Sequence, residues 1–361
     1  MPDELVGLAR ARAISDAPQE GPSPMRSTSG PDPLERAVGG DHLAYASLVE
    51  PLRRSVFRHC YQMLGSGLDA EDATQETLER AWRALASFSG SGSFAGWLHR
   101  IATNVCLDAL RLRRSRRDPT GEGPSVSPRS FSPEVDPERF WVEPVADADL
   151  AGRDPGEEVV RREDISLAFV AALQRLAPRQ RAALLLVDVL GFSHAEVAEV
   201  LGVNAGTINS LLARARQGAR ARPTRRRVDP DDVHVRALLD RYVQAWQLAD
   251  IGAFVQLVAD DVRLSMPPMS AWFEGRDAVV AFIGEVVFLP VQGLGVPMAP
   301  GWCNGQPAFA TYGSGSDGRF VVNGLQVLEL EPHHGGWLVE SIVSFRDAEL
   351  ATRCGFPRYL P

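Results

Sequence analysis

The sequence predicts a multidomain protein with two all-α domains followed by a C-terminal α+β domain. Apolar residues recur at helical spacing in LAYASLVEPLRRSVFRHCYQML and ATQETLERAWRAL, and helical spacing resumes over residues 164–219. The C-terminal third adds segments that alternate like strands, FVVNGLQVLEL and GWLVESIVSF. At 361 residues the chain is also longer than a chain that folds around a single ordinary core, which favours two or three domains.

Changes in composition predict where the domains begin and end. Residues 1–33 are rich in Pro, Gly, Ser and Asp without apolar periodicity, so we expect them to be disordered. Residues 115–163 are dense in Pro, Ser, Asp and Gly, which is the composition of a linker. The predicted domains are a first helical domain at 34–114, a second helical domain at 164–222 and the α+β domain at 229–361.

An aromatic segment, FWVEP at residues 140–144, interrupts the polar linker. The Phe140 and Trp141 side chains would be costly to leave in water. We therefore expect Phe140, Trp141 and Pro144 to dock on a neighbouring domain, together with Tyr359 in the C-terminal tail GFPRYLP.

Composition argues against several classes of protein. No stretch approaches the roughly 18 to 20 apolar residues that span a bilayer, and the N-terminus lacks the apolar run of a secretory signal, so we expect no membrane contact and a cytoplasmic location. The four cysteines are far apart with no CxxC pair, and the seven histidines lack ligand spacing. We expect buried, reduced cysteines, no metal site and no cofactor.

Positive charge is concentrated although the net charge is −8. Residues 111–117 read RLRRSRR, and residues 204–228 contain seven arginines and no acid. Every basic residue is arginine, which a GC-rich genome explains best and which also suits bidentate contacts with phosphate and guanine. These two blocks are candidate nucleic-acid contacts.

Residues 193–216, SHAEVAEVLGVNAGTINSLLARAR, have the spacing of a helix-turn-helix. Gly202 fits the tight turn and Asn204 the cap of the second helix. The alternative is a packed helical hairpin with a solvated basic face. If the motif binds DNA, its second helix presents hydrogen-bonding and basic side chains to the major groove and to phosphates: Thr207, Asn209, Ser210, Arg214 and Arg216.

The first helical domain carries two further candidate surfaces. The stripe Asp72, Gln75, Glu76 and Glu79 recurs at spacings of three and four, although such an acidic stripe is usually only a solvated face. The following helix and the arginine block after it offer groups that can hold an unstacked base and its phosphates. These are Trp97, Arg100, Asn104, Arg111 and Arg113, of which Trp97 fits packing better than base stacking.

In order and separation, the segments DAEDATQETLERAW, FAGWLHRIATNVCLDALR and the helix-turn-helix resemble regions 2 and 4 of the sigma-70 superfamily, in its extracytoplasmic-function branch. The resemblance implies a region 2 helical bundle whose Asp72, Gln75 and Glu76 bind the β′ clamp helices of core RNA polymerase. It also implies that Asn104 contacts a flipped base of the minus-ten element, and that region 4 contacts the β flap and reads the minus-thirty-five element. Such a protein performs no catalysis.

The last part resembles the SnoaL-like, ketosteroid-isomerase-shaped cone through YVQAWQLADIGAFVQLVADDVRLSMPP, FEGRDAVVAFI and WLVESIVSF. The combination is similar to the actinobacterial sigma factor G and J types. Asp260, Asp261 and Glu274 do not form an evident acid/base pair, so we expect no catalytic residue. Its apolar side chains either fill the core or line a pocket, which leaves a small-molecule or an intramolecular partner open: Met266, Trp272, Phe273, Phe282, Phe309 and Phe345.

We therefore predict a sigma factor that binds core polymerase and promoter DNA and is regulated by its own C-terminal domain. The alternative is a one-component regulator that binds duplex DNA through the helix-turn-helix and responds to a ligand in the cone. That alternative leaves residues 69–104 unexplained.

Overall fold

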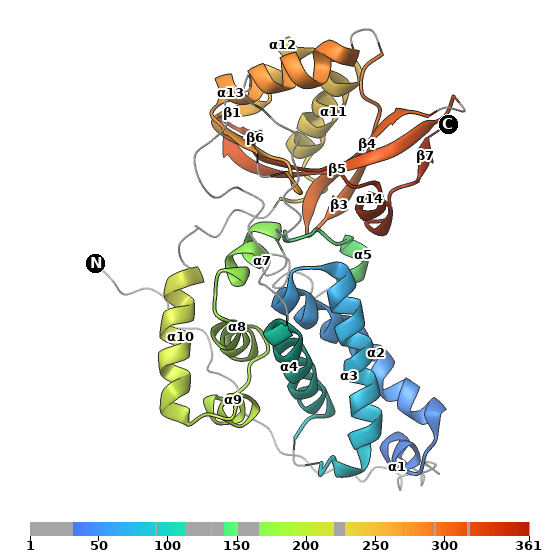
Figure 1. Cartoon of the computed structure of the whole chain (residues 1–361), viewed down its shortest axis with the longest axis vertical. Helices are drawn as coiled ribbons and strands as arrows, with labels where there is room; N and C mark the ends of the chain where they lie inside the picture. The colour runs from blue at the N-terminus through green and yellow to red at the C-terminus, as the bar shows by residue number, and fades with distance from the viewer. Residues whose placement is uncertain are drawn as a thin grey trace, which may run out of the picture.

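The chain forms a helical body and an α+β domain, and a connecting segment, residues 141–150, lies between them in space (Figure 1). The computed structural model describes residues 32–90, 92–112, 131, 141–150, 166–219, 228–269, 271–291, 294–315 and 318–360. The predicted order of two helical units and one α+β unit is confirmed. Arg113 and Phe140, which were expected to contribute to DNA and interdomain contacts, lie outside the described residues.

The first helical unit is a bundle in which α2, α3 and α4 pack on one another. Its elements are α1 (Pro33–Val38), α2 (His42–Leu64), α3 (Gly67–Ala84), the short 3₁₀ turn η1 (Leu85–Ser87) and α4 (Phe94–Leu112). The last turns of α2 are buried all around the helix, from Val56 to Leu64, including Arg58, His59 and Gln62. A helix that is buried on every side lies in the interior of a protein. The end of α2 lies where the two helical units, the connecting segment and the C-terminal domain meet.

The connecting segment and the second helical unit follow. Their elements are α5 (Asp147–Leu150), α7 (Leu167–Gln174), α8 (Pro178–Leu184), the π-helical turn η4 (Leu185–Val189), α9 (His194–Leu201) and α10 (Ala205–Ala219). Helix α8 packs against α4 and α2, and α9 packs against α4, so the two helical units form one body.

The C-terminal domain is a curved mixed sheet with helices on both sides. Its strands are β1 (Val258–Ser265), β2 (Trp272–Glu274), β3 (Met298–Cys303), β4 (Gln306–Ser314), β5 (Phe320–His333), β6 (Gly336–Phe345) and β7 (Tyr359–Leu360). They run in the order β2-β1-β6-β5-β4-β3, with β7 on β5, and only the β1–β6 pairing is parallel among the described pairs.

The helices of this domain divide between the two faces of the sheet. They are α11 (Val233–Gln247), α12 (Ile251–Val255), α13 (Arg276–Phe282), the turns η5 (Ile283–Phe288) and η6 (Leu289–Val291), and α14 (Ala348–Arg353). Helices α11 to α13 cover one face, whereas α14 lies on the other, toward the helical body (Figure 1).

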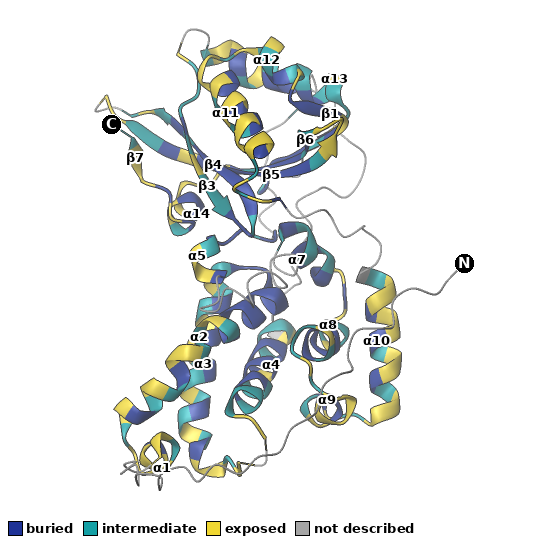
Figure 2. Cartoon of the chain, turned by 180° about the vertical axis from the view of Figure 1, so that it is seen from behind, coloured by how far each residue is buried: buried dark blue, intermediate teal, exposed yellow. Residues whose placement is uncertain are grey.

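The described residues form two large apolar cores and a small third one around Ala37, Ala44 and Leu85. One large core crosses the domain boundary, where Figure 2 shows buried residues on both sides. The first joins the helical body to the side of the sheet that carries Ala308, Ala310 and Tyr312, with Val142 and Val145 of the connecting segment between them. The second lies under α11 to α13. Because the first core is continuous, docking of the C-terminal domain buries apolar surface of both partners.

Two expectations from composition can be compared with the described residues. All four cysteines are free and buried, as predicted. Among the helices that the structure describes, none is long and apolar enough to cross a membrane.

His59 is the most perturbed histidine of the helical core. Burial lowers its pKa to about 3, and the nearby His99 and Arg58 add to the shift. Its Nε2 lies 2.9 Å from the Thr103 hydroxyl oxygen, and that hydroxyl donates to the His99 carbonyl at 2.8 Å. Nε2 is therefore the donor, and the ring is neutral in the folded protein.

We predict that His59 makes the helical body sensitive to acid. The unfolded chain binds a proton at this histidine below about pH 6.5, whereas the folded chain does so only near pH 3, so the free energy of unfolding falls as pH drops through this window. The limiting slope is about 1.4 kcal/mol per pH unit. Urea titrations from pH 7.5 to 4.5, followed by far-UV circular dichroism, give the free energy of unfolding at each pH. This free energy should fall less steeply with falling pH for His59→Asn than for the unmodified chain. His194→Asn, at an exposed histidine, is the control and should behave like the unmodified chain.

Candidate polymerase and DNA interface

Helix α3 presents the acidic stripe to solvent. Asp72, Gln75 and Glu79 are exposed, and Glu76 is partly buried. The opposite face packs inward through small residues, and the buried hydroxyls of Thr74 and Thr77 donate to carbonyls one turn earlier. The helix thus has one packed face and one hydrophilic face, as its spacing predicts.

Two members of the stripe are held by neighbouring arginines. Glu76 accepts from Arg80 at 2.7 Å, and Arg80 also reaches Asp108 on α4 at 3.3 Å. Glu79 pairs with Arg83 at 2.8 Å, one turn along the helix. These exposed pairs contribute little to stability, and they can exchange for contacts with a partner. Asp72 has no ion pair among the described residues and is the most available acid of the stripe.

Helix α4 carries the four described residues expected at the minus-ten element. Trp97 packs in an aromatic cluster, with its ring centroid 5.3 Å from Phe88 and 5.6 Å from Phe94, so it is a packing residue here. Asn104 and Arg111 are exposed, and Arg111 donates to Asp108 at 2.8 Å. Asn104 is thus free of the core and accessible from outside.

The fourth residue of α4, Arg100, faces the helix-turn-helix. Its guanidinium lies 3.3 Å from the Glu199 carboxylate of α9. The predicted DNA-contacting sides of the two helical units are therefore close together. We infer that any nucleic acid bound at Arg100 would have to replace Glu199.

The helix-turn-helix is built by local sequence signals. Ser193 and Glu196 form a reciprocal capping box at the start of α9, with Ser193 N donating to Glu196 at 2.9 Å. Gly202 ends α9 in the left-handed conformation, with φ of 61°, which glycine adopts without strain. Asn204 then caps α10 by accepting from Thr207 N at 2.8 Å. These are the turn and the cap that the sequence predicts.

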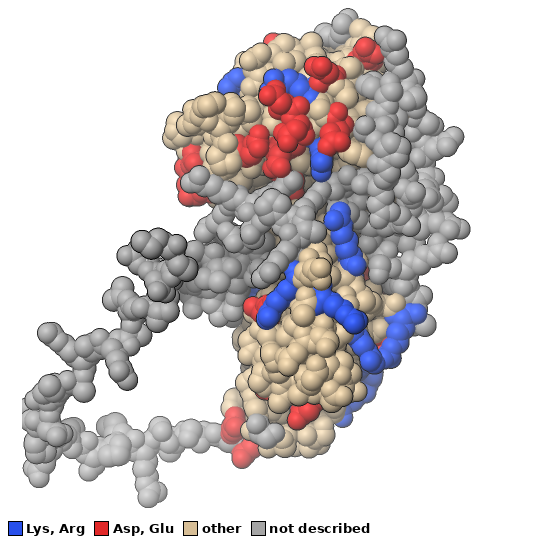
Figure 3. Space-filling model, turned by 90° about the vertical axis from the view of Figure 1, so that its left-hand side faces the viewer, with Lys and Arg blue, Asp and Glu red and all other residues tan. Residues whose placement is uncertain are grey.

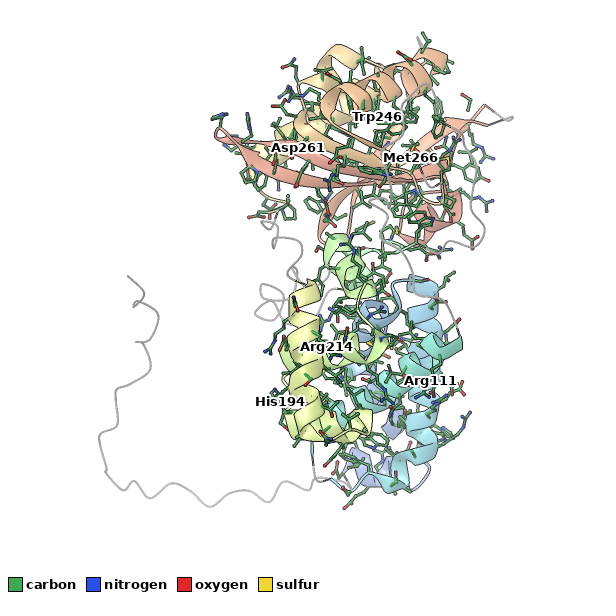
Figure 4. The ribbon with its side chains drawn as sticks, turned by 60° about the vertical axis from the view of Figure 1, so that its left-hand side comes forward. Arg111, His194, Arg214, Trp246, Asp261 and Met266 are labelled. Carbon is green, nitrogen blue, oxygen red and sulfur yellow. The ribbon has the colours of Figure 1, made fainter. Side chains whose placement is uncertain are left out.

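Helix α10 separates a packed side from an exposed side. Ile208, Leu212 and Ala215 are fully buried against α8 and α9. Asn209, Ser210 and Arg214 are exposed and lie on the outward side of α10, the helix on which Figure 4 labels Arg214. That outward side offers the small polar and cationic groups that a major groove accepts.

Two expected DNA contacts have partners within the protein. The Thr207 hydroxyl lies 2.9 Å from the Asn204 side chain and belongs to the helix cap. Arg216 makes a bidentate pair with Asp188 at 2.7 and 3.0 Å. Since this pair is exposed, Arg216 can still exchange Asp188 for phosphate, whereas Thr207 contributes to the shape of the turn.

A polar junction joins the helical body, the connecting segment and the C-terminal domain. Asn304, in the turn between β3 and β4, accepts from Val145 N at 2.9 Å and donates to the Tyr61 hydroxyl of α2 at 3.0 Å. Tyr61 in turn donates to the Glu143 carbonyl at 2.8 Å. Burial raises the pKa of Tyr61 well above its ordinary value. Tyr61 therefore remains a neutral donor within the junction.

The same turn reaches the second helical unit. The side-chain amide oxygen of Gln306 accepts from Leu167 N, at the start of α7, at 2.9 Å. Gly305 N donates to Asp147 at 2.7 Å. Residues 304–306 thus contact both helical units and the segment between them. Sequence reasoning missed this turn, although the Asn-Gly pair in WCNGQP is a strong hairpin signal.

The predicted interdomain residues have different environments. Trp141 is buried, and its indole N–H donates to the Pro268 carbonyl of the C-terminal domain at 3.3 Å. Pro144 is buried, and its carbonyl accepts from the Cys354 thiol. Tyr359 instead lies in β7 on its own domain, 42% exposed, with the Arg319 guanidinium 4.4 Å from its ring centroid. Tyr359 is thus part of an intradomain contact, because β7 extends the sheet edge beside β5.

A buried arginine that the sequence did not single out binds the second helical unit to the first. Arg181 of α8 is fully buried and donates to the carbonyls of Leu173, Leu176 and Met63. Met63 belongs to α2, so this guanidinium spans the two units. Burial lowers its pKa to about 10, which leaves it charged at neutral pH. The only signal in the sequence is a charge inside the apolar run RAALLLV.

The fold and these surfaces define a DNA-binding protein. Its helix-turn-helix packs on a helical bundle, and its third domain contacts both of these helical units. Three family models match in that order. Residues 48–117 match sigma-70 region 2, residues 166–217 match sigma-70 region 4, and residues 239–336 match the SnoaL-like domain.

Known proteins agree with this order. The chain is 40% identical over 340 residues to the ECF RNA polymerase sigma factor SigG of Mycobacterium tuberculosis H37Rv, covering 93% of this chain and 89% of SigG. It is 31% identical over 245 residues to SigJ of the same strain, covering 66% and 71% of the two chains. The crystal structure of M. tuberculosis SigJ shares the fold, with a TM-score of 0.54 at 24% identity over 85% of this chain and 98% of SigJ.

The chain therefore belongs to the extracytoplasmic-function sigma factors of the sigma-70 family and carries a SnoaL-like domain at its C-terminal end. As a member of this non-enzymatic family, it directs transcription initiation and binds core RNA polymerase and promoter DNA.

We predict that Asn304→Gly loosens the junction without disturbing the turn. Asn304 has φ of 56°, which glycine adopts freely, so the substitution removes only the side-chain hydrogen bonds. Losing a buried partner costs about 1 to 3 kcal/mol. Hydrogen exchange of the peptide that contains Val145 should therefore accelerate by at least about fivefold.

The control is His334→Gly in the exposed turn between β5 and β6. Like Asn304, His334 has a positive φ, 37°, in a hairpin turn of the sheet. Among the described residues it makes no contact with the junction. Equal exchange at Val145 in both variants would show that Asn304 does not hold the junction.

Proposed function

We propose that this sigma factor binds the β′ clamp helices of core polymerase through the exposed stripe of α3, with Asp72 and Gln75 at its centre. The support is that these side chains leave the bundle on one face and take no part in its packing. The Glu76 and Glu79 ion pairs are exposed, so both carboxylates can join the contact after exchanging Arg80 and Arg83. The β flap is the proposed partner of the second helical unit, and the cytoplasm is the proposed location.

The proposed promoter contacts divide between two helices. Asn209, Ser210 and Arg214 of α10 read the minus-thirty-five element, and Arg216 binds a neighbouring phosphate after releasing Asp188. Asn104 of α4 receives a flipped base of the minus-ten element, with Arg100 and Arg111 at the flanking phosphates. Trp97 supports α4 by packing rather than by stacking on a base.

We further propose that the docked C-terminal domain limits activity. The two promoter elements are separated by about 25 base pairs, or roughly 85 Å of duplex at 3.4 Å per base pair. Helices α4 and α9 are in contact here, so the two helical units must separate to reach both elements. The proposal is supported mainly by the 304–306 turn, which contacts both helical units at once. These contacts favour the closed arrangement, in which α4 and α9 touch.

Run-off transcription with core polymerase tests this regulation. The Asn304→Gly chain should give several-fold more product than the unmodified chain at limiting sigma concentration, because less of it is closed. His334→Gly should give the unmodified level. Equal or lower product from Asn304→Gly would rule out an inhibitory role for the docked domain.

We predict that Asp72→Arg weakens binding to core polymerase about tenfold, or about 1.4 kcal/mol, because it reverses the charge that faces the clamp. Fluorescence anisotropy with labelled sigma factor measures this affinity, and circular dichroism checks that the helix is intact. Glu285→Arg, an exposed acid on the C-terminal domain, makes the same change in net charge and should have no effect. Unchanged affinity of the Asp72 variant would remove α3 from the interface.

We predict that the two promoter contacts can be separated by mutation. Arg214→Ala should lower affinity for duplex that carries the upstream element by about 1 to 3 kcal/mol. Asn104→Ala should leave duplex binding nearly unchanged and reduce strand opening, which permanganate footprinting reports. Normal opening by the Asn104 variant would contradict its assignment to the flipped base.

A further inference from the structure

The four cysteines form two pairs whose thiols are in contact. The Cys303 thiol, in β3, is hydrogen-bonded to the Cys354 thiol at the end of α14. The Cys60 and Cys106 thiols, in α2 and α4, form a second hydrogen-bonded pair. A disulfide needs two sulfurs that can approach to about 2 Å, so each pair meets the first requirement for one.

The two pairs differ in their access to small molecules. Cys60, Cys106 and Cys303 are fully buried, whereas Cys354 keeps 6% of its surface exposed. Cys354 lies on the wall of a cavity of about 580 Å³ between the helical body and the C-terminal domain. The other walls belong to α2, α3 and the connecting segment, and they carry arginines and carboxylates. A cavity of this size with polar walls admits water and molecules of similar size, such as hydrogen peroxide.

The Cys303–Cys354 pair adjoins the polar junction between the domains. The Cys354 thiol donates to the Pro144 carbonyl at 3.5 Å. Cys303 forms an isolated β-bridge with Ala146 and directly precedes Asn304. In Figure 1, α14 lies on the side of the sheet that faces α5 and the helical body. A chemical change at these two sulfurs therefore acts where the connecting segment contacts the C-terminal domain.

We propose that Cys303 and Cys354 form a disulfide when hydrogen peroxide enters this cavity, and that the disulfide loosens the connecting segment. The Cys354 sulfur attacks one peroxide oxygen and the O–O bond breaks, which gives a sulfenic acid on Cys354 and one water. The Cys303 sulfur then attacks the Cys354 sulfur, the S–O bond breaks, and the hydroxyl leaves with the Cys303 proton as a second water. The two thiols lose two electrons, which reduce the peroxide.

The order of these steps follows from the surroundings of the two thiols. Peroxide reaches Cys354 first, because Cys354 lies on the cavity wall and Cys303 lies behind it. The hydrogen bond with Cys354 and burial hold the pKa of Cys303 well above its ordinary value, so Cys303 remains a thiol at neutral pH. Since the thiolate is the form that attacks peroxide, Cys303 reacts instead with the sulfenic acid that it already contacts. The disulfide no longer has the S–H that donates to Pro144.

Mass spectrometry of the full chain tests the site. After treatment with millimolar hydrogen peroxide, alkylation in urea and tryptic digestion without reductant, residues 354–358 should be linked to the peptide that contains Cys303. The Cys60–Cys106 pair is the internal control, since its thiols are in contact but fully buried, and it should be recovered alkylated. Absence of the Cys303–Cys354 disulfide, or equal oxidation of the control pair, would overturn the proposal. This test on the unmodified chain does not depend on the folding of any variant.

Single serine variants test the order of attack. In Cys303→Ser the sulfenic acid on Cys354 has no thiol partner, so dimedone should label Cys354. In Cys354→Ser, dimedone should leave Cys303 unlabelled. Labelling of Cys303 in that variant, without labelling of Cys354 in Cys303→Ser, would show that peroxide does not enter at Cys354.

Hydrogen exchange measures the consequence for the connecting segment. The Val145 amide donates to Asn304 beside the affected contact, so the peptide that contains Val145 should exchange about two- to tenfold faster in the oxidised chain. Cys354→Ser retains every methionine and controls for methionine oxidation, and peroxide should leave its exchange rate unchanged. An unchanged rate in a chain that carries the disulfide would contradict the loosening. None of these measurements uses polymerase or DNA, so failure here is distinguishable from failure of the proposed clamp contact.

Discussion

The arrangement of the whole molecule depends on the hydrogen bonds that Asn304 makes at the end of α2. This side chain satisfies Val145 and Tyr61 at once, inside an apolar core that runs from the helical body into the sheet. Buried polar groups specify one geometry because any displacement leaves a donor or an acceptor unpaired. The apolar core supplies the attraction between the domains, and the junction fixes their register.

The second helical unit is held by a different kind of contact. Arg181 places a positive charge in the interior and compensates for its desolvation with several backbone carbonyls, one of which belongs to α2. Removing any of those acceptors would leave a buried charge poorly solvated, which costs more than losing a neutral hydrogen bond. The Arg100–Glu199 pair nearby is exposed and adds little. The closed state therefore combines the apolar core with buried polar contacts at Asn304 and Arg181.

The charge on the C-terminal domain does not favour DNA binding. Figure 3 shows one face of the molecule, on which arginine side chains gather on the helical body and acidic side chains gather on the C-terminal domain. Like charges on the C-terminal domain and on DNA repel, whereas the exposed face of α10 attracts phosphate. The net charge of −8 thus conceals two regions with opposite preferences.

The sequence alone determined the local structure and the family. Helical periodicity, the Ser193 and Asn204 caps and the Gly202 turn defined the helix-turn-helix, because each signal acts within a few residues of its partner. The tertiary structure decided which polar groups are buried. No local signal marks Arg181, Tyr61 and Asn304 as the polar groups that join the domains, and each of them is hydrogen-bonded to a residue more than a hundred positions away. Periodicity identifies the face of an element that packs but not its partner, so the place of Cys354 on the cavity wall and the intradomain position of Tyr359 could not be predicted.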